Sequence, residues 1–297
     1  MKPFTYIEPK LLPEALALLA QHGDEAKVIA GGTALVNFMK HGLIEPRVVV
    51  GLRQLKHLRQ ISVSNEIRIG ALSTLHNIQT SPLILSHAPL LAEACRHVAT
   101  VRVRSMATIG GALAFADPAL DTPPALIVLD GKIRLRSQHA ERDIPADRFF
   151  KGIFESALEP QEIISEVTIP AQPTDCGCAF LKFAPATHDD YATVCVAVRV
   201  TITDGRICDA RIALGAVGTT PIRAVEAEPA LRGFAPDEKI FSDVARMTAE
   251  SLQPVTNLRS SSEYKRAMVV VFVRRALDLA AKRAIGLVPQ EKSGPRS

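Results

Sequence analysis

Two glycine pairs, each beside a threonine, constrain this chain more than any other feature of its sequence. Gly31-Gly32-Thr33 follows an apolar run, and Thr108-Ile109-Gly110-Gly111 lies about eighty residues further on. Glycine lets the backbone adopt conformations that are closed to other residues and lets a ligand approach its N–H groups closely. A row of such N–H groups with a hydroxyl beside it suits a phosphate. Two such loops suggest a diphosphate held from both sides, although tight turns in an α/β lobe explain the glycines equally well from the residues alone.

The first glycine loop lies between an expected strand and an expected helix. Residues 27–30 are apolar enough for a strand, and residues 35–40 have the spacing of a short helix that ends at His41-Gly42. The start of a helix favours an anion, because its first backbone N–H groups have no partner within the helix. This placement supports the phosphate interpretation of the loop.

The size and charge of the chain exclude some classes of protein. A length of 297 residues is comfortable for two domains, and 47% hydrophobic with 22% charged residues is ordinary for a globular protein. The net charge is only +4, Trp is absent and three Tyr occur, so no basic surface with stacking aromatics is expected. We therefore expect no binding of nucleic acid.

The termini and cysteines predict a cytoplasmic protein without a membrane span. The N-terminal sequence MKPFTYIEP lacks the apolar core of a secretory signal, and no apolar run approaches the roughly 18 residues of a spanning helix. The five cysteines are odd in number, and the single close pair, Cys176 and Cys178, is a poor match to zinc or iron–sulfur ligand spacing. Free thiols and no metal site are expected.

The pattern of apolar residues changes near residue 172, which suggests a domain boundary. Before it, strands and helices alternate; after it come strands at 179–183, 193–203 and 206–217, with an Asp204-Gly205 turn, and then two helices near 236–252 and 261–285. Arg102 and Arg104 alternate with valines, which predicts a strand with one exposed face. We expect a first domain at 1–172 with lobes at about 1–54 and 55–172, a linker at 171–177, a second domain at 173–286 and a disordered tail at 287–297.

Six sequence blocks, in this order, resemble the FAD-binding medium subunit of the molybdenum hydroxylases, the family of aerobic carbon monoxide dehydrogenase and xanthine dehydrogenase. Together they span about residues 3 to 285. The blocks are AGGTAL at 30–35, IGALST at 69–74, ATIGGALAFADPALDTPPAL at 107–126, FLKFAPATHDDYATV at 180–194, GAVGTTPIRA at 215–224 and SSSEYKRAMVVVFVRRAL at 260–277.

The resemblance implies a fold and a set of cofactor-binding residues. The fold class is α+β: an α/β-type two-lobed FAD-binding domain, PCMH/vanillyl-alcohol-oxidase-like, followed by a C-terminal α+β domain of antiparallel sheet plus helices. Asp121 would accept hydrogen bonds from the adenosine part of FAD, Ile163 or Ile164 would supply an apolar contact, Lys182 would lie near the cofactor, and Tyr191 would approach the flavin. The residues implied to hold the diphosphate are Ala30, Gly31, Gly32, Thr33, Ala34 and Leu35 on one side and Thr108, Gly110 and Gly111 on the other.

Four positions depart from the family pattern. Val103 and Ala112 stand where the family commonly has Asn, residues 186–188 replace a segment that contains Arg, and Asn257 replaces a frequent Asp. These departures imply fewer polar contacts around the flavin. They leave the identity of the electron acceptor open.

The resemblance also implies a function within a complex. The chain would be the FAD-binding electron-transfer subunit of a heterotrimeric molybdenum-containing hydroxylase or dehydrogenase, passing electrons from iron–sulfur clusters to an external acceptor. The implied partners are a large subunit with a molybdenum-pterin cofactor and a small subunit with two 2Fe-2S clusters, assembled as a dimer of heterotrimers. The chain shows no nucleophile–base pair, no H-E-x-x-H motif and no evident pair of catalytic carboxylates. We therefore expect no catalytic residue and no substrate turnover by the chain alone.

Two alternative functions remain compatible with the sequence. A stand-alone FAD-dependent oxidase or reductase could use the same glycine loops, but it would need its own substrate pocket and base. A regulatory module that binds a nucleotide without redox chemistry would have affinity for ADP-ribose and no flavin absorbance.

Overall fold

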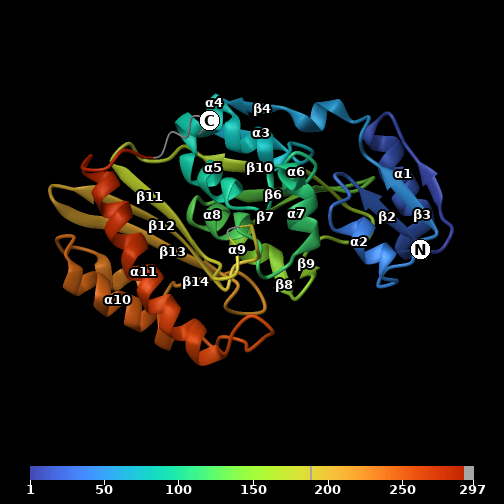
Figure 1. Ribbon diagram of the computed structural model, residues 1–297. Helices are drawn as coiled ribbons and strands as arrows, with labels where there is room; N and C mark the ends of the chain where they lie inside the picture. The colour runs from blue at the N-terminus through green and yellow to red at the C-terminus, as the bar shows by residue number, and fades with distance from the viewer. Residues whose placement is uncertain (188, 291–297) are drawn as a thin grey trace.

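The computed structural model describes residues 1–187 and 189–290, which form three units in a row along the molecule (Figure 1). The N-terminal unit lies at one end, a middle unit at the centre and a C-terminal unit at the other end. Each unit is built around its own sheet, so the order of the units in space follows their order in sequence.

The N-terminal unit is a small parallel sheet of strand order β1-β3-β2 with two helices and two 3-10 turns. Helix α1 packs Ala15, Leu16 and Leu19 into the core of this unit and ends at Gly23, whose positive φ of 51° suits the end of a helix. Residues 35–40 form the short helix expected from the sequence. The elements are β1 (Thr5–Ile7), α1 (Leu12–His22), η1 (Gly23–Glu25), β2 (Ala26–Ile29), α2 (Leu35–Lys40), β3 (Val48–Gly51) and η2 (Lys56–Arg59).

The middle unit is a five-stranded antiparallel sheet of order β4-β5-β10-β6-β7, with helices packed beside it and a small β8-β9 hairpin. Its core joins apolar residues of β5, β6 and β10 to the buried faces of α3, α5, α7 and α8. The elements are β4 (Ile61–Val63), β5 (Glu66–Gly70), α3 (Leu75–Thr80), α4 (Pro82–His87), α5 (Pro89–Arg96), α6 (Val101–Arg104), α7 (Ile109–Phe115), α8 (Thr122–Val128), β6 (Lys132–Arg136), β7 (Glu141–Pro145), α9 (Ala146–Phe149), β8 (Phe150–Gly152), β9 (Glu155–Ser156) and β10 (Ile163–Pro170).

The C-terminal unit is a four-stranded antiparallel sheet of order β11-β12-β13-β14 with two long helices, which confirms the expected antiparallel sheet plus helices. Figure 1 shows α11 crossing this sheet with α10 beside it. Gly177 lets α11 approach β11 closely, because a Cβ there would lie 2.0 Å from the carbonyl oxygen of Ala280. The elements are β11 (Cys176–Phe183), β12 (Val194–Thr203), β13 (Arg206–Gly215), β14 (Ile222–Arg223), η3 (Glu228–Leu231), α10 (Glu238–Glu250) and α11 (Ser262–Ala284).

A buried ion pair joins the middle and C-terminal units. Arg283 of α11 donates to Glu93 of α5 at 3.0 Å and to the carbonyl oxygen of Cys178 at 2.6 Å. Both charged side chains are almost fully buried. Gln290, at the end of the described chain, hydrogen-bonds the backbone of Cys178, and the remaining tail, 291–297, lies outside the described residues.

Two local expectations are wrong. The segment with alternating valine and arginine is the helix α6 rather than a strand, because the Thr100 side chain accepts a hydrogen bond from Val103 N and starts a helical turn. Arg104 then donates to the carbonyl oxygens of Val98 and Ala99. The expected linker is also shorter than 171–177, because Cys176 and Gly177 already belong to β11.

No helix in the described part of the chain is long and apolar enough to cross a membrane. All five cysteines are free thiols.

Candidate functional site

A cleft of about 920 Å³ lies between the N-terminal and middle units and reaches the start of the C-terminal unit. This volume falls within the roughly 300–1,000 Å³ of ordinary ligand sites. Every cofactor-binding residue expected from the sequence lines it: Ala30, Gly31, Gly32, Thr33, Ala34, Leu35, Thr108, Gly110, Gly111, Asp121, Ile163, Ile164, Lys182 and Tyr191.

The two glycine loops lie against each other at the base of the cleft. A Cβ on Gly31 would be 1.8 Å from the carbonyl oxygen of Met106, just before the second loop, and a Cβ on Gly111 would be 4.0 Å from the Cβ of Ala30. Glycine at position 31 is therefore required by the contact itself, because both atoms it meets on Met106 belong to the backbone. The loops are close enough for one diphosphate to contact both.

The second loop is fixed by contacts on both sides. Thr108 begins α7, and its side chain accepts a hydrogen bond from Gly111 N at 3.1 Å. Gly110 N donates to the carbonyl oxygen of Ala71 at 2.9 Å, and a Cβ on Gly110 would be 2.7 Å from the Cβ of Ala71. The loop is thus held rigidly in place beside the end of β5.

The first loop turns sharply into α2. Gly32 has a positive φ of 73°, a conformation that suits glycine, and Asn37 of α2 donates to the carbonyl oxygen of Thr33 at 3.0 Å. Residues 30–35 all line the cleft, so their backbone forms one wall of it.

A buried ion pair closes another side of the cleft. Lys182 Nζ lies 2.8 Å from Asp121 Oδ2 and also donates to the carbonyl oxygen of His97 at 2.8 Å. The two side chains are 3% and 5% exposed. Burial raises the pKa of Asp121 to about 7 even though Lys182 lowers it. The other carboxylate oxygen, Oδ1, is buried and has no hydrogen-bond partner within the described residues, so it is open to a donor from a ligand.

The remaining expected residues form apolar and aromatic walls. Ile163 and Ile164 were alternatives for one contact, and both line the cleft, although they belong to separate cores. Tyr191 is 43% exposed, and burial of part of the side chain raises its pKa. The guanidinium of Arg259 lies over its ring, 5.0 Å from the centroid, and also 3.7 Å from Asp190. This cation–π contact connects the residue to the loop before α11.

The positions that depart from the family pattern have different surroundings. Val103 and Ala112 line the cleft, so apolar side chains stand there. Asn257 lies in a turn, where its side chain accepts hydrogen bonds from the backbone of Arg259 and Ser260. Residue 188 lies outside the described residues, so the structure does not describe the whole 186–188 segment.

Several residues that line the cleft carry no motif that sequence reasoning could use. Phe38, Phe115 and Phe154 are the main examples. Phe38 lies on the helix that follows the first glycine loop, and Phe115 lies on the helix that carries the second. This position is the one signal in the sequence that could have indicated them. Phe154 is about forty residues from the second loop and is brought in by the fold.

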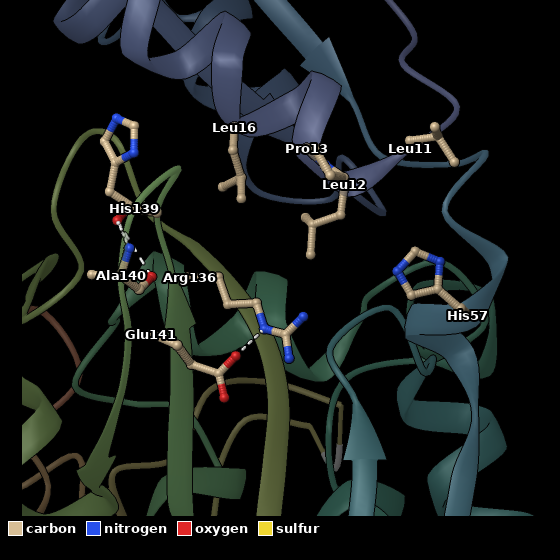
Figure 2. Close-up of a pocket in the computed structure, with 10 residues that line it drawn as sticks. Leu11, Leu12, Pro13, Leu16, His57, Arg136, His139, Ala140 and Glu141 are labelled. Atoms are coloured by element: carbon tan, nitrogen blue, oxygen red, sulfur yellow. Dashed lines mark hydrogen bonds and ion pairs between the residues drawn. The ribbon is translucent and has the colours of Figure 1, made fainter.

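A second hollow of about 560 Å³ lies apart from these residues, between α1 and the β6-β7 hairpin (Figure 2). Figure 2 shows His57 and His139 on its rim and Arg136 paired with Glu141. The Arg136 Nε and Glu141 Oε2 atoms are 2.6 Å apart. None of the expected site residues lines this hollow. Within the described ranges, no three His, Cys, Asp or Glu side chains gather as a possible metal site.

Comparison with known proteins decides the family. The profile described as the FAD binding domain in molybdopterin dehydrogenase matches residues 2–172, more than half of the chain. The chain belongs to this family. The profile of the CO dehydrogenase flavoprotein C-terminal domain matches residues 179–280.

Relatives and solved structures agree with membership of the FAD-binding family of molybdopterin dehydrogenases. The 6-hydroxypseudooxynicotine dehydrogenase complex subunit alpha of Paenarthrobacter nicotinovorans is 35% identical, over 96% of this chain and 97% of the relative. The carbon monoxide dehydrogenase medium chain of Hydrogenophaga pseudoflava is 33% identical, over 94% and 98%. A solved structure of carbon monoxide dehydrogenase from Hydrogenophaga pseudoflava superimposes with a TM-score of 0.92 at 35% identity, covering 95% of this chain and 99% of that chain.

Another solved structure, quinoline 2-oxidoreductase from Pseudomonas putida 86, superimposes with a TM-score of 0.91 at 31% identity, covering 96% of this chain and 100% of that chain. The resemblance drawn from the six sequence blocks is thus confirmed, as is the two-domain fold class. The chain is an FAD-binding component of an oxidoreductase.

Proposed function

We propose that this chain holds FAD in the cleft and transfers electrons as the FAD subunit of a heterotrimeric molybdenum-containing hydroxylase or dehydrogenase. The observation that carries this proposal is the contact between the two glycine loops, in the same cleft as the open carboxylate oxygen of Asp121. The cleft fits FAD in its chemistry: the backbone amides of the first glycine loop, with the second loop packed closely beside it, suit the diphosphate, a buried acceptor suits a hydroxyl or amine, and apolar walls suit the rings.

Each group of residues has its own part in this proposal. Bound FAD supplies the redox chemistry, which the protein side chains do not perform. The backbone of Ala30–Leu35 and of Thr108–Gly111 holds the diphosphate, and Asp121 Oδ1 accepts a hydrogen bond from the adenosine part. Lys182 keeps the Asp121 carboxylate oriented, because it is itself anchored on the carbonyl oxygen of His97. Ile163 and Ile164 provide apolar contact, and Tyr191 covers the rim near the flavin.

The complex extends the electron path on both sides of this chain. We propose a large subunit with the molybdenum-pterin cofactor, where substrate is oxidised, and a small subunit with two 2Fe-2S clusters, which delivers electrons to the FAD. The FAD subunit passes them to an external acceptor, and two heterotrimers form the assembly. We further propose a cytoplasmic location, which five free thiols support.

The division of labour within the chain follows the domains that we propose. Residues 1–172, with lobes at about 1–54 and 55–172, would provide most of the cofactor site. Residues 173–286 would form the second domain and contribute Lys182 and Tyr191 to it.

Purification of the tagged full chain from its own host tests this proposal. The expected complex has three kinds of subunit and contains FAD, molybdenum and iron, and the chain isolated away from its partners does not oxidise substrate. A complex without flavin would contradict the cofactor assignment. Substrate oxidation by the isolated chain would favour a stand-alone oxidase or reductase, and affinity for ADP-ribose without flavin would favour a regulatory module.

A further inference from the structure

Three phenylalanines from three separate elements meet at one side of the cleft. Phe38 lies on α2, Phe115 on α7 and Phe154 in the turn of the β8-β9 hairpin. Their ring centroids are 5.2 Å apart for Phe38 and Phe115, 5.5 Å for Phe38 and Phe154, and 5.0 Å for Phe115 and Phe154. All three line the cleft. We call this group the aromatic cluster.

The backbone at Phe154 is strained. Its φ is +58°, in the left-handed region that bulky residues rarely adopt, and the residue is 47% exposed. The hairpin turn is anchored, because Phe154 N donates to the carbonyl oxygen of Ala116 at 3.1 Å, at the end of α7. Glycine would fit this turn without strain. A large ring held at a strained and exposed position points to a task beyond folding of the hairpin.

The aromatic cluster connects the two walls of the cleft. Phe38 belongs to the N-terminal unit and follows the first glycine loop, while Phe115 belongs to the middle unit and follows the second. Phe154 contacts both rings. The interplanar angles of 75° and 78° between Phe38 and its two partners are edge-to-face contacts, which are favourable for aromatic pairs. The cluster therefore holds the two glycine loops at a fixed separation.

We propose that the aromatic cluster is a clasp that holds the cleft closed around FAD and shields the isoalloxazine ring from water. This inference rests on the proposed function. Asp121 supplies the polar contact expected for adenosine, whereas the cluster gives an apolar and aromatic surface suited to a flat heteroaromatic ring. Closing the clasp restricts the access of water and small solutes to that ring.

Substitution of Phe154 by glycine tests the clasp. Phe154→Gly removes the ring and also relieves the strained φ, so relief of strain offsets part of the lost aromatic packing and the flavin-free protein still folds. In the assembled complex, we expect the variant to bind FAD about tenfold more weakly, since Phe154 no longer joins the two walls of the cleft around the ligand. Iodide ions quench the fluorescence of the bound flavin more strongly than in the wild type.

Matched variants separate the clasp from general effects of the hairpin. Ile153→Ala changes the neighbouring exposed residue, which does not line the cleft, and should leave FAD affinity and iodide quenching unchanged. Phe154→Tyr keeps the ring and should behave as the wild type. If Phe154→Gly does not fold, Phe38→Leu and Phe115→Leu provide the same comparison from the other two elements.

The outcomes distinguish failure of the clasp from failure of the proposed function. Wild-type complex that holds no FAD overturns both. The clasp alone is overturned if the wild-type and Phe154→Gly complexes bind FAD with equal affinity and iodide quenches their flavin fluorescence equally. Loss of partner subunits from Phe154→Gly with unchanged flavin binding would assign the ring to a subunit contact and would also overturn the clasp.

Discussion

Replacement of Gly31 by alanine tests the contact between the two glycine loops. The new Cβ would lie 1.8 Å from the carbonyl oxygen of Met106 and 2.6 Å from its carbonyl carbon. An ordinary contact between carbon and oxygen needs about 3.3 Å. The first loop must therefore move away from Met106 by about 1.5 Å, because both obstructing atoms are backbone atoms and cannot rotate aside.

This displacement is large compared with the tolerance of a hydrogen bond. A ligand that contacts both loops with bonds of about 2.9 Å would find one set stretched beyond 4 Å, where a hydrogen bond no longer exists. Loss of one or two bonds to a charged diphosphate corresponds to about 3 kcal/mol, or roughly a hundredfold in the dissociation constant of FAD. We also expect the unfolding free energy to fall by about 1–3 kcal/mol, as for other overpacked sites.

The assay is titration of FAD into flavin-depleted complex, with urea unfolding of the same samples. Gly42→Ala is the matched control: its φ is +70°, but no atom lies within 4 Å of the new Cβ. It should lose about 1 kcal/mol of stability through backbone strain and keep full FAD affinity. A folded Gly31→Ala protein whose FAD affinity is within twofold of the wild type would refute the reasoning.

Three further predictions concern other parts of the structure. Burial raises the pKa of Asp121 to about 7, so the folded flavin-free protein binds a proton that the unfolded chain releases near pH 4. Its unfolding free energy should therefore fall by up to about 4 kcal/mol as the pH rises from about 4 to about 7. Asp121→Asn should lack this pH dependence in urea unfolding, and the same pH dependence in the variant and the wild type would contradict the assignment. Arg283→Met removes the buried pair with Glu93 and should lower the unfolding free energy by about 3–5 kcal/mol in the same assay. Lys282→Met loses an exposed pair with Asp278 and should change the unfolding free energy by less than about 1 kcal/mol. Equal effects of the two substitutions would show that burial of the pair is unimportant. Thr108→Val removes the side-chain acceptor for Gly111 N and should cost about 1 kcal/mol of stability, measured by thermal unfolding, while Thr108→Ser retains it; a Thr108→Ser protein as unstable as Thr108→Val would exclude the cap as the cause.

Local patterns predicted the elements whose burial is periodic. The apolar run of β2, the spacing of α2 and the Asp204-Gly205 turn were all evident, because each depends on neighbours in the sequence. The edge strand β7 was not evident, since most of its side chains are exposed and it has no apolar alternation. The strand expected at 101–104 failed because four residues of alternation are too few to outweigh the helix start at Thr100.

The site shows the same limit in three dimensions. The glycine loops could be indicated from sequence because their residue types are specific to close backbone approach, and the family resemblance gave Asp121 and Lys182. The sequence could not predict the buried pair of Asp121 and Lys182. The two residues are 61 positions apart, and their contact depends on how β11 docks against the middle unit. Phe154 could not be predicted either, because its left-handed backbone is set by the anchored turn.

If Lys182 helps to hold FAD as proposed, its position on β11 affects when a newly made chain can acquire the flavin. The glycine loops and Asp121 leave the ribosome first, but the carboxylate has no lysine beside it until the strand Cys176–Phe183 has been synthesised and docked. We therefore expect FAD to bind late in biogenesis, and we expect a polypeptide truncated before that strand to carry no flavin. The yellow colour of bound FAD would then indicate that synthesis has passed the strand Cys176–Phe183.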